Sequence, residues 1–335
     1  MNHPIPSFRP TTPRKHHSHG DEGHEAKALS QISPEPALIG IDWGTTSLRA
    51  YLIGAGGEVL DKVASSRGIT SVPDRAFDSV LNQLIACWST YGGLPVLASG
   101  MITSRNGWVE TPYSRLPLGT VGLAQSLVPH HTESRMNIHF ITGAVIDHAS
   151  GADVMRGEET QIIGAQAFGM SDGIFVMPGT HSKWVRVSAG RIEDFATYMT
   201  GEVFAALKGH TILGTLIGDG PFDPEGFAQG VSCGLARESY LLHDLFRVRT
   251  LPLLGRMAGN AVADFLSGML IGAEVKAAQI RGDTNETITI VGRCDLADRY
   301  ETALKIAGKT SQRLSEDTVA HGHYLIARAA EIVNV

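Results

Sequence analysis

Two turns in the chain combine a glycine with hydroxyl side chains, a residue pattern that suits phosphate binding. The segment IGIDWGTTSLRAYLIGAGG (residues 39–57) aligns without a gap on IFVMPGTHSKWVRVSAGR (residues 174–191), which places Ser47 over Ser182. A glycine lets the backbone approach a phosphate, consecutive N–H groups form an anion-binding nest, and hydroxyls add donors. Gly and Thr are also ordinary turn residues, so one such turn is weak evidence, whereas two matched turns predict a polyphosphate clamp. The predicted phosphate contacts are Gly44, Thr45, Thr46, Gly179, Thr180 and Ser182.

The two turns differ in the charged residues beside them. Asp42 precedes the first turn, Met177 stands at the matching position before the second, and Lys183 follows the second turn. A nucleotide between the turns needs one Mg²⁺, which binds one or two carboxylates and keeps waters and phosphate oxygens as its other ligands. We therefore expect Asp42 to hold Mg²⁺ through water and Lys183 to offset phosphate charge. The simpler alternatives are a strand-end carboxylate and a solvated lysine.

A separate acidic segment could supply proton transfer. Phosphoryl transfer to an alcohol requires a base within hydrogen-bond reach of the attacking hydroxyl. In VMRGEETQIIGA, Gly157 permits a close approach and is followed by Glu158 and Glu159 at the start of a predicted helix. Acidic residues also stabilise helix N-termini, so a purely structural role is the alternative for this segment.

The elements that would position these residues occur twice along the chain. Residue patterns predict three-stranded meanders over Leu38–Asp42, Leu48–Ile53 and Glu58–Ser65, and over Ile174–Met177, Lys183–Val187 and Arg191–Thr197. Further strands are predicted at Pro95–Ser99, Ile138–Ile146 and Thr287–Val291. Helices are predicted over Ala76–Tyr91, Glu159–Phe168, Glu202–Lys208, Gly226–Leu242, Asn260–Ile280, Leu296–Ala307 and Val319–Val333. These elements indicate an α/β protein of two related halves, each a mixed β-sheet flanked by helices.

The length of 335 residues suits two domains. We expect an N-terminal domain over residues 37–149 and a C-terminal domain over residues 150–335. Residues 1–36 are rich in His, Pro and Ser without an apolar period, which predicts a disordered tail. The cluster of His16, His17 and His19 could bind a metal, but an unstructured segment is the simpler interpretation.

The composition describes a globular protein and argues against several classes. Hydrophobic residues make up 43% of the chain, charged residues 19%, and the net charge is −6 at pH 7. No basic stripe suits a nucleic acid. No apolar run reaches the roughly 18 residues of a membrane span, and the start lacks a secretory apolar segment. The 3 cysteines form no CxxC pair. We therefore expect a cytoplasmic protein with neither a nucleic-acid nor a membrane partner.

Taken together, these motifs resemble those of a known superfamily. IGIDWGTTSLRAYL and VMPGTHSKWV resemble the two phosphate motifs of the actin, sugar kinase and hsp70 ATPase superfamily, and ITIVGRCDLADRY, with Gly292, resembles its adenosine motif. The resemblance implies two ribonuclease H-like (actin-like ATPase) domains with an ATP cleft between them. With SGMITSRNGW, VMRGEETQIIGA, MTGE and FLSGMLIGAEV, the set resembles the 2-dehydro-3-deoxygalactonokinase family over nearly all of residues 38–333.

The resemblance also implies ATP and Mg²⁺ as cofactors and a position for the base. In carbohydrate kinases of this superfamily, a glycine followed by an acid shortly before the second phosphate motif carries the general base. Gly157 and Glu158 match that pattern. Because many relatives have aspartate there, Glu159 and Asp153 are kept as lesser candidates.

A 2-keto-3-deoxy sugar acid presents a carboxylate, a ketone and hydroxyls, so its pocket needs a cation and neutral donors. Arg156 and Arg105 are the candidates for the cation. Ser99, Ser104, Asn106 and Tyr113 are the candidate neutral donors, and Trp108 is the candidate pocket wall. The alternatives are core aromatics and surface arginines.

The predicted activity is ATP-dependent phosphorylation of 2-dehydro-3-deoxy-D-galactonate to its 6-phosphate in galactonate catabolism. Two alternatives stay open: a kinase for another small sugar or sugar acid, and a non-enzymatic, actin-like sugar sensor that uses the nucleotide to change shape. The residues do not decide between the galactonate and gluconate epimers, or between a monomer and a homo-oligomer.

Overall fold

The computed structural model describes residues 35–148, 151–236, 240–280 and 286–333. Residues Pro34–Val335 form one compact unit. Residues 1–34 of the predicted tail, with its histidine cluster, lie outside the described residues. The first strand begins at Pro36, the last residue of that predicted tail. The domain division near residue 149 stays a prediction. In the described ranges, no helix is long and apolar enough to cross a membrane.

The first sheet is built on the first predicted meander. Its strands are β1 (Pro36–Trp43), β2 (Leu48–Gly54), β3 (Val59–Ser65), β4 (Val96–Ser99), β7 (Val128–His131) and β8 (Asn137–Phe140). β1, β2 and β3 are antiparallel, β4 runs parallel to β1, and β8 runs parallel to β4. The strand order is β3-β2-β1-β4-β8-β7. The helix α1 (Phe77–Ile85) buries its apolar face in this sheet's core.

The second sheet repeats this arrangement. Its strands are β6 (Leu118–Gly119), β11 (Gly173–Met177), β12 (Ser182–Ser188), β13 (Arg191–Tyr198), β14 (Ile288–Val291) and β15 (Ser311–Leu314). β11, β12 and β13 form the second antiparallel meander, β14 runs parallel to β11, and β15 runs parallel to β14. A meander continued by two parallel strands in each sheet is the expected ribonuclease H-like order, so the predicted fold class is confirmed.

The predicted strand over residues 138–146 is wrong, because the chain divides there between two sheets. β8 ends at Phe140, and β9 (Gly143–His148) pairs instead with β10 (Gly151–Met155) and β5 (Tyr113–Arg115). The Thr142 hydroxyl lies 2.8 Å from the Ser114 and Ser126 hydroxyls, which holds the chain where it leaves the first sheet. Both strands are short and apolar at this point, so the pattern contains no sign of the break.

The helix that carries the acidic segment packs on a helix from the end of the chain. These helices are α3 (Glu158–Ala165) and α10 (Thr318–Ala329), and α10 also contacts α2 (Thr120–Gln125) and β1. At Gly164 an added Cβ would lie 1.9 Å from the Thr318 carbonyl oxygen, and at Gly322 it would lie 1.9 Å from that of Thr160. The two helices therefore pack backbone to backbone, which fixes the start of α3 relative to β1.

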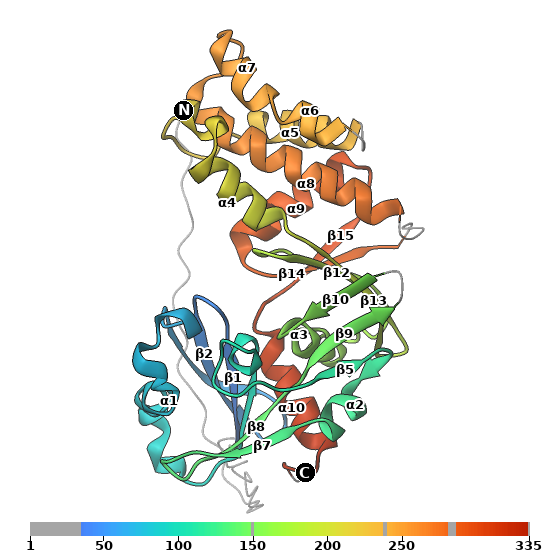
Figure 1. Ribbon diagram of the computed structural model, residues 1–335. Coiled ribbons are helices and arrows are strands. Elements are labelled where there is room, and N and C mark those ends of the chain that lie inside the picture. Colours follow the sequence, from blue (N-terminus) through green and yellow to red (C-terminus); the bar gives the residue numbers. More distant parts are fainter. Residues whose placement is uncertain (1–34, 149–150, 237–239, 281–285, 334–335) are drawn as a thin grey trace, which may run out of the picture. The chain divides into compact units, whose positions relative to one another are not determined.

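Some of the remaining helices share a core with the second sheet, and the others pack on these helices rather than on the sheet (Figure 1). The remaining helices are α4 (Thr200–His210), α5 (Pro224–Ala236), α6 (Leu241–Asp244), α7 (Arg247–Leu253), α8 (Val262–Ile280) and α9 (Cys294–Ile306). Gly268 and Gly272 on α8 allow close packing against a neighbouring helix. Cβ atoms there would lie 2.1 Å from the Phe227 carbonyl oxygen and 2.4 Å from that of Val231, both on α5. The backbone contact with α5 fixes the position of α8.

Candidate active site

One cavity of about 550 Å³ brings together both turns and the acidic segment. The predicted site residues that line it are Asp42, Gly44, Thr45, Thr46, Tyr113, Arg156, Glu158, Gly179, Thr180, Lys183 and Gly292. The predicted site residues outside its lining are Ser99, Ser104, Arg105, Asn106, Trp108 and Ser182. The cavity thus holds the predicted phosphate, metal and base positions but only part of the predicted sugar pocket.

The first turn is held in place through its carbonyl groups. The Gly44 N–H donates to the Ser47 carbonyl oxygen at 2.9 Å. The N–H groups of Ile69 and Thr70 donate to the carbonyl oxygens of Gly44 and Thr45 at 3.0 and 3.4 Å. With its carbonyl groups engaged by this neighbouring segment, the turn is rigid before any ligand binds, which favours anion binding.

The second turn is held by the start of α4. The Glu202 N–H donates to the Thr180 carbonyl oxygen at 3.0 Å. A Cβ at Gly201 would lie 2.5 Å from the Gly179 carbonyl oxygen, so the helix start and the turn touch through their backbones. His181, which follows in the turn, places Nε2 2.6 Å from a Glu202 carboxylate oxygen. The turn and the first turn of α4 therefore form one rigid unit.

The strand registers reveal an unpredicted cation at the first turn. Asp42 on β1 pairs with Arg49 on β2, whereas Met177 on β11 pairs with Lys183 on β12. The second turn is one residue shorter between these pairs, so the ungapped alignment is wrong beyond the turn. Arg49 and Lys183 are therefore equivalent, and both line the cavity.

The same shift explains why Ser182 lies outside the cavity. Counting back from the equivalent cations, Ser182 takes the position of Leu48, and both residues are fully buried. The Ser182 hydroxyl donates to Glu274 on α8 at 2.7 Å. A direct contact between this hydroxyl and a phosphate is not supported by its position.

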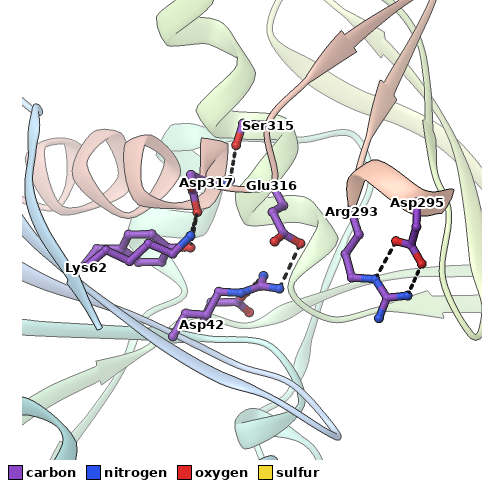
Figure 2. A network of polar contacts seen from close by, with 9 residues as sticks. Asp42, Lys62, Arg293, Asp295, Ser315, Glu316 and Asp317 are labelled. Atoms are coloured by element: carbon purple, nitrogen blue, oxygen red, sulfur yellow. Dashed lines mark hydrogen bonds and ion pairs between the residues drawn. The ribbon is translucent and has the colours of Figure 1, made fainter. Parts of the chain in front are cut away.

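Asp42 lies between the cavity and a network of charged residues. Arg49 contacts the Asp42 carboxylate at 3.3 Å and the Glu316 carboxylate at 2.9 Å. Figure 2 shows Asp317, just before α10, in contact with Lys62 of the first sheet; its neighbour Glu316 accepts from Arg49 of the same sheet. Burial raises the pKa of Asp42 to about 6, and Arg49 opposes that rise. With a pKa of about 6, the Asp42 carboxyl is mostly ionised at pH 7 and lies beside the Arg49 cation.

Glu158 reaches the cavity from a turn that requires glycine. Gly157 has a φ of +104°, and an added Cβ would lie 3.1 Å from the Gly100 Cα. Gly100, with a φ of +91°, in turn has so little space that a Cβ would lie 3.3 Å from the Asp42 carboxylate. This pair of glycines lets the chain before Glu158 approach the end of β1 at Asp42. Burial raises the pKa of Glu158, and the charge of Lys183 lowers it.

The two lesser candidates for the base point elsewhere. Glu159 is 1% exposed, and its carboxylate accepts from the Gly157 N–H at 2.8 and 2.9 Å. Burial, with the neighbouring Glu158 charge, raises the pKa of Glu159 to about 8. Asp153 accepts from the Thr197 N–H and hydroxyl at 2.7 and 2.5 Å. Neither residue lines the cavity, so Glu158 is the candidate that the geometry favours.

Arg156 and Tyr113 mark the acceptor side of the cavity. The Arg156 guanidinium donates to the hydroxyls of Thr103 and Thr111 at 2.9 and 2.7 Å, and its carbon lies 3.9 Å from the centre of the Tyr113 ring. Its buried Nε has no hydrogen-bond partner among the described residues. A fixed cation that lines the cavity suits an anionic group of the substrate.

The other predicted sugar-pocket residues have different environments. The Ser99 hydroxyl lies 3.0 Å from Nε2 of the buried His323 on α10. The Ser104 hydroxyl donates to the Met101 carbonyl oxygen at 2.7 Å. Trp108 packs in an aromatic cluster with Phe77, His130 and Phe140. Arg105 and Asn106 are exposed. Their predicted contacts with the sugar therefore lack support from the geometry.

A second, smaller cavity adjoins the main one. It measures about 170 Å³ and shares Gly179 and Leu296 with the main cavity. Phe204, Leu270 and Ile271 supply apolar walls. The polar side chains along it are those of Thr200, Ser267, Arg299 and Tyr300. This slot is an apolar site beside a phosphate turn, which the sequence did not predict.

Sequence and structure comparisons agree on one family. The sequence profile of the 2-keto-3-deoxy-galactonokinase family matches residues 42–326. The chain is 36% identical to 2-dehydro-3-deoxygalactonokinase of Escherichia coli (strain K12) over 84% of its own length and 93% of that protein. It is 35% identical to a Rhizobium meliloti (strain 1021) protein assigned by name to the same enzyme, over 86% of this chain and 96% of that one.

A solved structure supports the same conclusion. The crystal structure of a Sinorhizobium meliloti protein assigned by name to this enzyme superposes with a TM-score of 0.82 at 33% identity, over 87% of this chain and 98% of that one. The predicted family resemblance is thus confirmed. The chain belongs to the 2-keto-3-deoxy-galactonokinase family, and it is an ATP-using kinase by class.

Proposed function

We propose that the protein transfers the γ-phosphoryl group of MgATP to the primary hydroxyl of 2-dehydro-3-deoxy-D-galactonate and forms the 6-phosphate. The observation that carries the proposal is the single cavity that joins two phosphate turns to the carboxylate of Glu158. Phosphoryl transfer needs positioning, charge neutralisation and a base, and the three sets of residues supply these in one place. Membership of the family supports the choice of acceptor.

The nucleotide lies along the second turn in this proposal. Its adenosine occupies the smaller slot, where Phe204 and Leu296 offer apolar contacts, and Gly179 leads from the slot to the main cavity. The phosphates then lie between the two turns, flanked by Arg49 and Lys183. Gly292, predicted for the adenosine, lines the main cavity rather than the slot, so its contact falls nearer the sugar of the nucleotide.

The residues at Asp42 fit a magnesium ion. In the described ranges, no group of three or more His, Cys, Asp or Glu residues could enclose a metal. Mg²⁺ bound to a nucleotide does not need such a group, because phosphates and waters supply most of its ligands. Asp42 would hold the ion through water, and the ion, when bound, neutralises charge on the transferring phosphoryl group.

The acceptor lies on the side of the cavity formed by Arg156 and Tyr113. Arg156, whose guanidinium is held by Thr103 and Thr111, supplies the positive charge on this side for the carboxylate of the sugar acid. Glu158 accepts the proton of the attacking hydroxyl as the new phosphorus–oxygen bond forms. Its burial makes this carboxylate a stronger base than an exposed one, and Lys183 keeps it ionised.

The test is ADP release by the purified protein with MgATP and a panel of acceptors. The panel contains 2-dehydro-3-deoxy-D-galactonate, its gluconate epimer and neutral sugars. Selective turnover with the galactonate compound supports the proposal. Turnover with another acceptor alone would replace the substrate but keep the kinase. Nucleotide binding without turnover on any acceptor would favour a sugar sensor instead. Cytoplasmic location, the absence of nucleic-acid or membrane partners and the oligomeric state stay predictions.

A further inference from the structure

A buried carboxylate on α8 joins the segments that surround the proposed nucleotide site. Glu274 is 3% exposed, and burial raises its pKa. One carboxylate oxygen accepts from the Ser182 hydroxyl at 2.7 Å and the Trp184 indole N–H at 2.8 Å. The other accepts from the Tyr300 hydroxyl at 2.7 Å and from the Thr200 hydroxyl. Four neutral donors thus converge on one buried acidic group.

These donors come from separate parts of the chain. Ser182 ends the second phosphate turn, and Trp184 follows on β12. Thr200 begins α4, whose next residues touch the backbone of the turn, and Tyr300 lies on α9. Thr200 and Tyr300 also line the smaller slot. The carboxylate therefore connects the turn with two walls of the slot, while Asp42 and Glu158 belong to other elements.

The position of Glu274 itself is fixed by packing. It lies on α8, two residues beyond Gly272, where α8 contacts the α5 backbone. A buried carboxylate without hydrogen bonds is strongly unfavourable, so its four donors are drawn into one arrangement. Packing alone does not explain a carboxylate at this position, because an apolar side chain of similar size would fill the space without the cost of burying a charge.

We propose that Glu274 is a positioning residue that sets the affinity for the nucleotide by holding the second phosphate turn against the slot. This inference rests on the proposed placement of the nucleotide. Glu274 contacts neither the acceptor side nor the base in this account. Its loss should therefore raise the KM for MgATP while leaving kcat and the KM for the sugar acid nearly unchanged.

The test compares Glu274→Gln with Val275→Ala. Glutamine keeps the size of the side chain, but its amide nitrogen cannot accept, so two of the four donors lose their partner. Val275 is fully buried on the same helix and lines neither cavity, so its truncation measures loss of packing alone. We expect the KM for MgATP to rise about 10-fold in Glu274→Gln and less than about 2-fold in Val275→Ala.

Single-donor variants keep the test valid if Glu274→Gln does not fold. Thr200→Val and Ser182→Ala each remove one donor, and each should raise the KM for MgATP by a few fold. If Glu274→Gln folds, either change can be combined with it in a double variant. The added rise in the KM for MgATP should then be smaller than the rise that the same change causes alone, because both changes act through the same carboxylate. Equal effects of Glu274→Gln and Val275→Ala on that KM, or a fall in kcat alone, would overturn the inference.

Direct titration with MgATP separates this inference from the proposed reaction. If the wild-type protein binds MgATP but does not phosphorylate the sugar acid, the reaction is wrong, and the ratio of dissociation constants still tests Glu274. If turnover is selective but the two variants bind MgATP equally, only the Glu274 inference fails. If the wild-type protein does not bind MgATP, both are wrong.

Discussion

Lys183 occupies in the second hairpin the position that Arg49 occupies in the first. Arg49 pairs with Asp42 on β1, and Lys183 pairs with Met177 on β11. All four residues line the cavity. The duplicated hairpin thus supplies one cation from each half to the space between the phosphate turns. Only the first hairpin has a carboxylate opposite its cation, which matches a site for one magnesium ion.

Replacing either cation should weaken nucleotide binding. We expect Arg49→Met and Lys183→Met each to raise the KM for MgATP by about 10- to 100-fold, since each removes a charge-assisted contact to phosphate. Steady-state kinetics at varied MgATP measure this. Arg186→Met is the matched control, because Arg186 lies on the same strand but is exposed outside the cavity. If Arg186→Met raised the KM for MgATP equally, the assignment of Arg49 and Lys183 to the phosphates would be wrong.

Replacing Glu158 should remove transfer but not binding. We expect Glu158→Gln to lower kcat by about 10²- to 10⁴-fold, because the amide cannot accept the hydroxyl proton. The dissociation constant for MgATP should change little. Glu159→Gln is the control. Burial raises the pKa of Glu159 to about 8, so its carboxyl is already largely neutral at pH 7. If Glu159→Gln lost activity and Glu158→Gln kept it, the base would be reassigned.

The turn that carries Glu158 should not tolerate a side chain. Gly157→Ala forces a φ of +104° on alanine and places its Cβ 3.1 Å from Gly100. We expect a loss of about 1–2 kcal/mol in the free energy of unfolding and a larger fall in kcat than strain alone would give. Gly169→Ala has a similar positive φ with no atom near its Cβ. Unfolding curves measure the loss of stability, and steady-state kinetics measure kcat. If kcat fell equally in the two variants, the close approach of Gly157 to Gly100 would not matter for catalysis.

His323 should make the protein less stable in acid. Burial lowers the pKa of His323 to about 3, whereas an unfolded histidine titrates near 6.5. As the pH falls from about 6.5 toward 3, the unfolded state binds a proton that the folded state does not, so stability is lost. The stability difference between wild type and His323→Gln should shift against the wild type by about 2 kcal/mol from pH 7 to 5. Denaturant titrations at both pH values measure it, and parallel pH profiles would exclude this role.

Local patterns account for the parts of the fold that the sequence predicted. The meanders alternate over short distances, and α8 has helical spacing along its length, so both were found with ends shifted by a few residues. The division between β8 and β9 was missed because the hydroxyls that hold Thr142 come from distant residues. The contact of α10 with β1 is equally non-local. The contact of α10 with α3 is also non-local, because Gly164 and Gly322, which meet there, are about half the chain apart.

The candidate site was predictable in the same sense. Asp42, Glu158 and the two turns were found because each sits in a short motif. Arg49 was missed although it stands in the first motif, because its place depends on a turn that is one residue longer than the other. Ser182 was assigned to phosphate for the same reason. The buried partners of Ser99 and Ser182, His323 and Glu274, lie far along the chain.

The most direct test of the account identifies the product of the wild-type protein. MgATP and 2-dehydro-3-deoxy-D-galactonate are incubated with the protein, and the products are followed by phosphorus NMR. The account predicts ADP and a phosphate monoester in equal amounts, with the phosphorus coupled to the two protons of the C6 methylene, and almost none of either with Glu158→Gln. ADP accompanied only by inorganic phosphate, or a phosphate on another carbon, would contradict it.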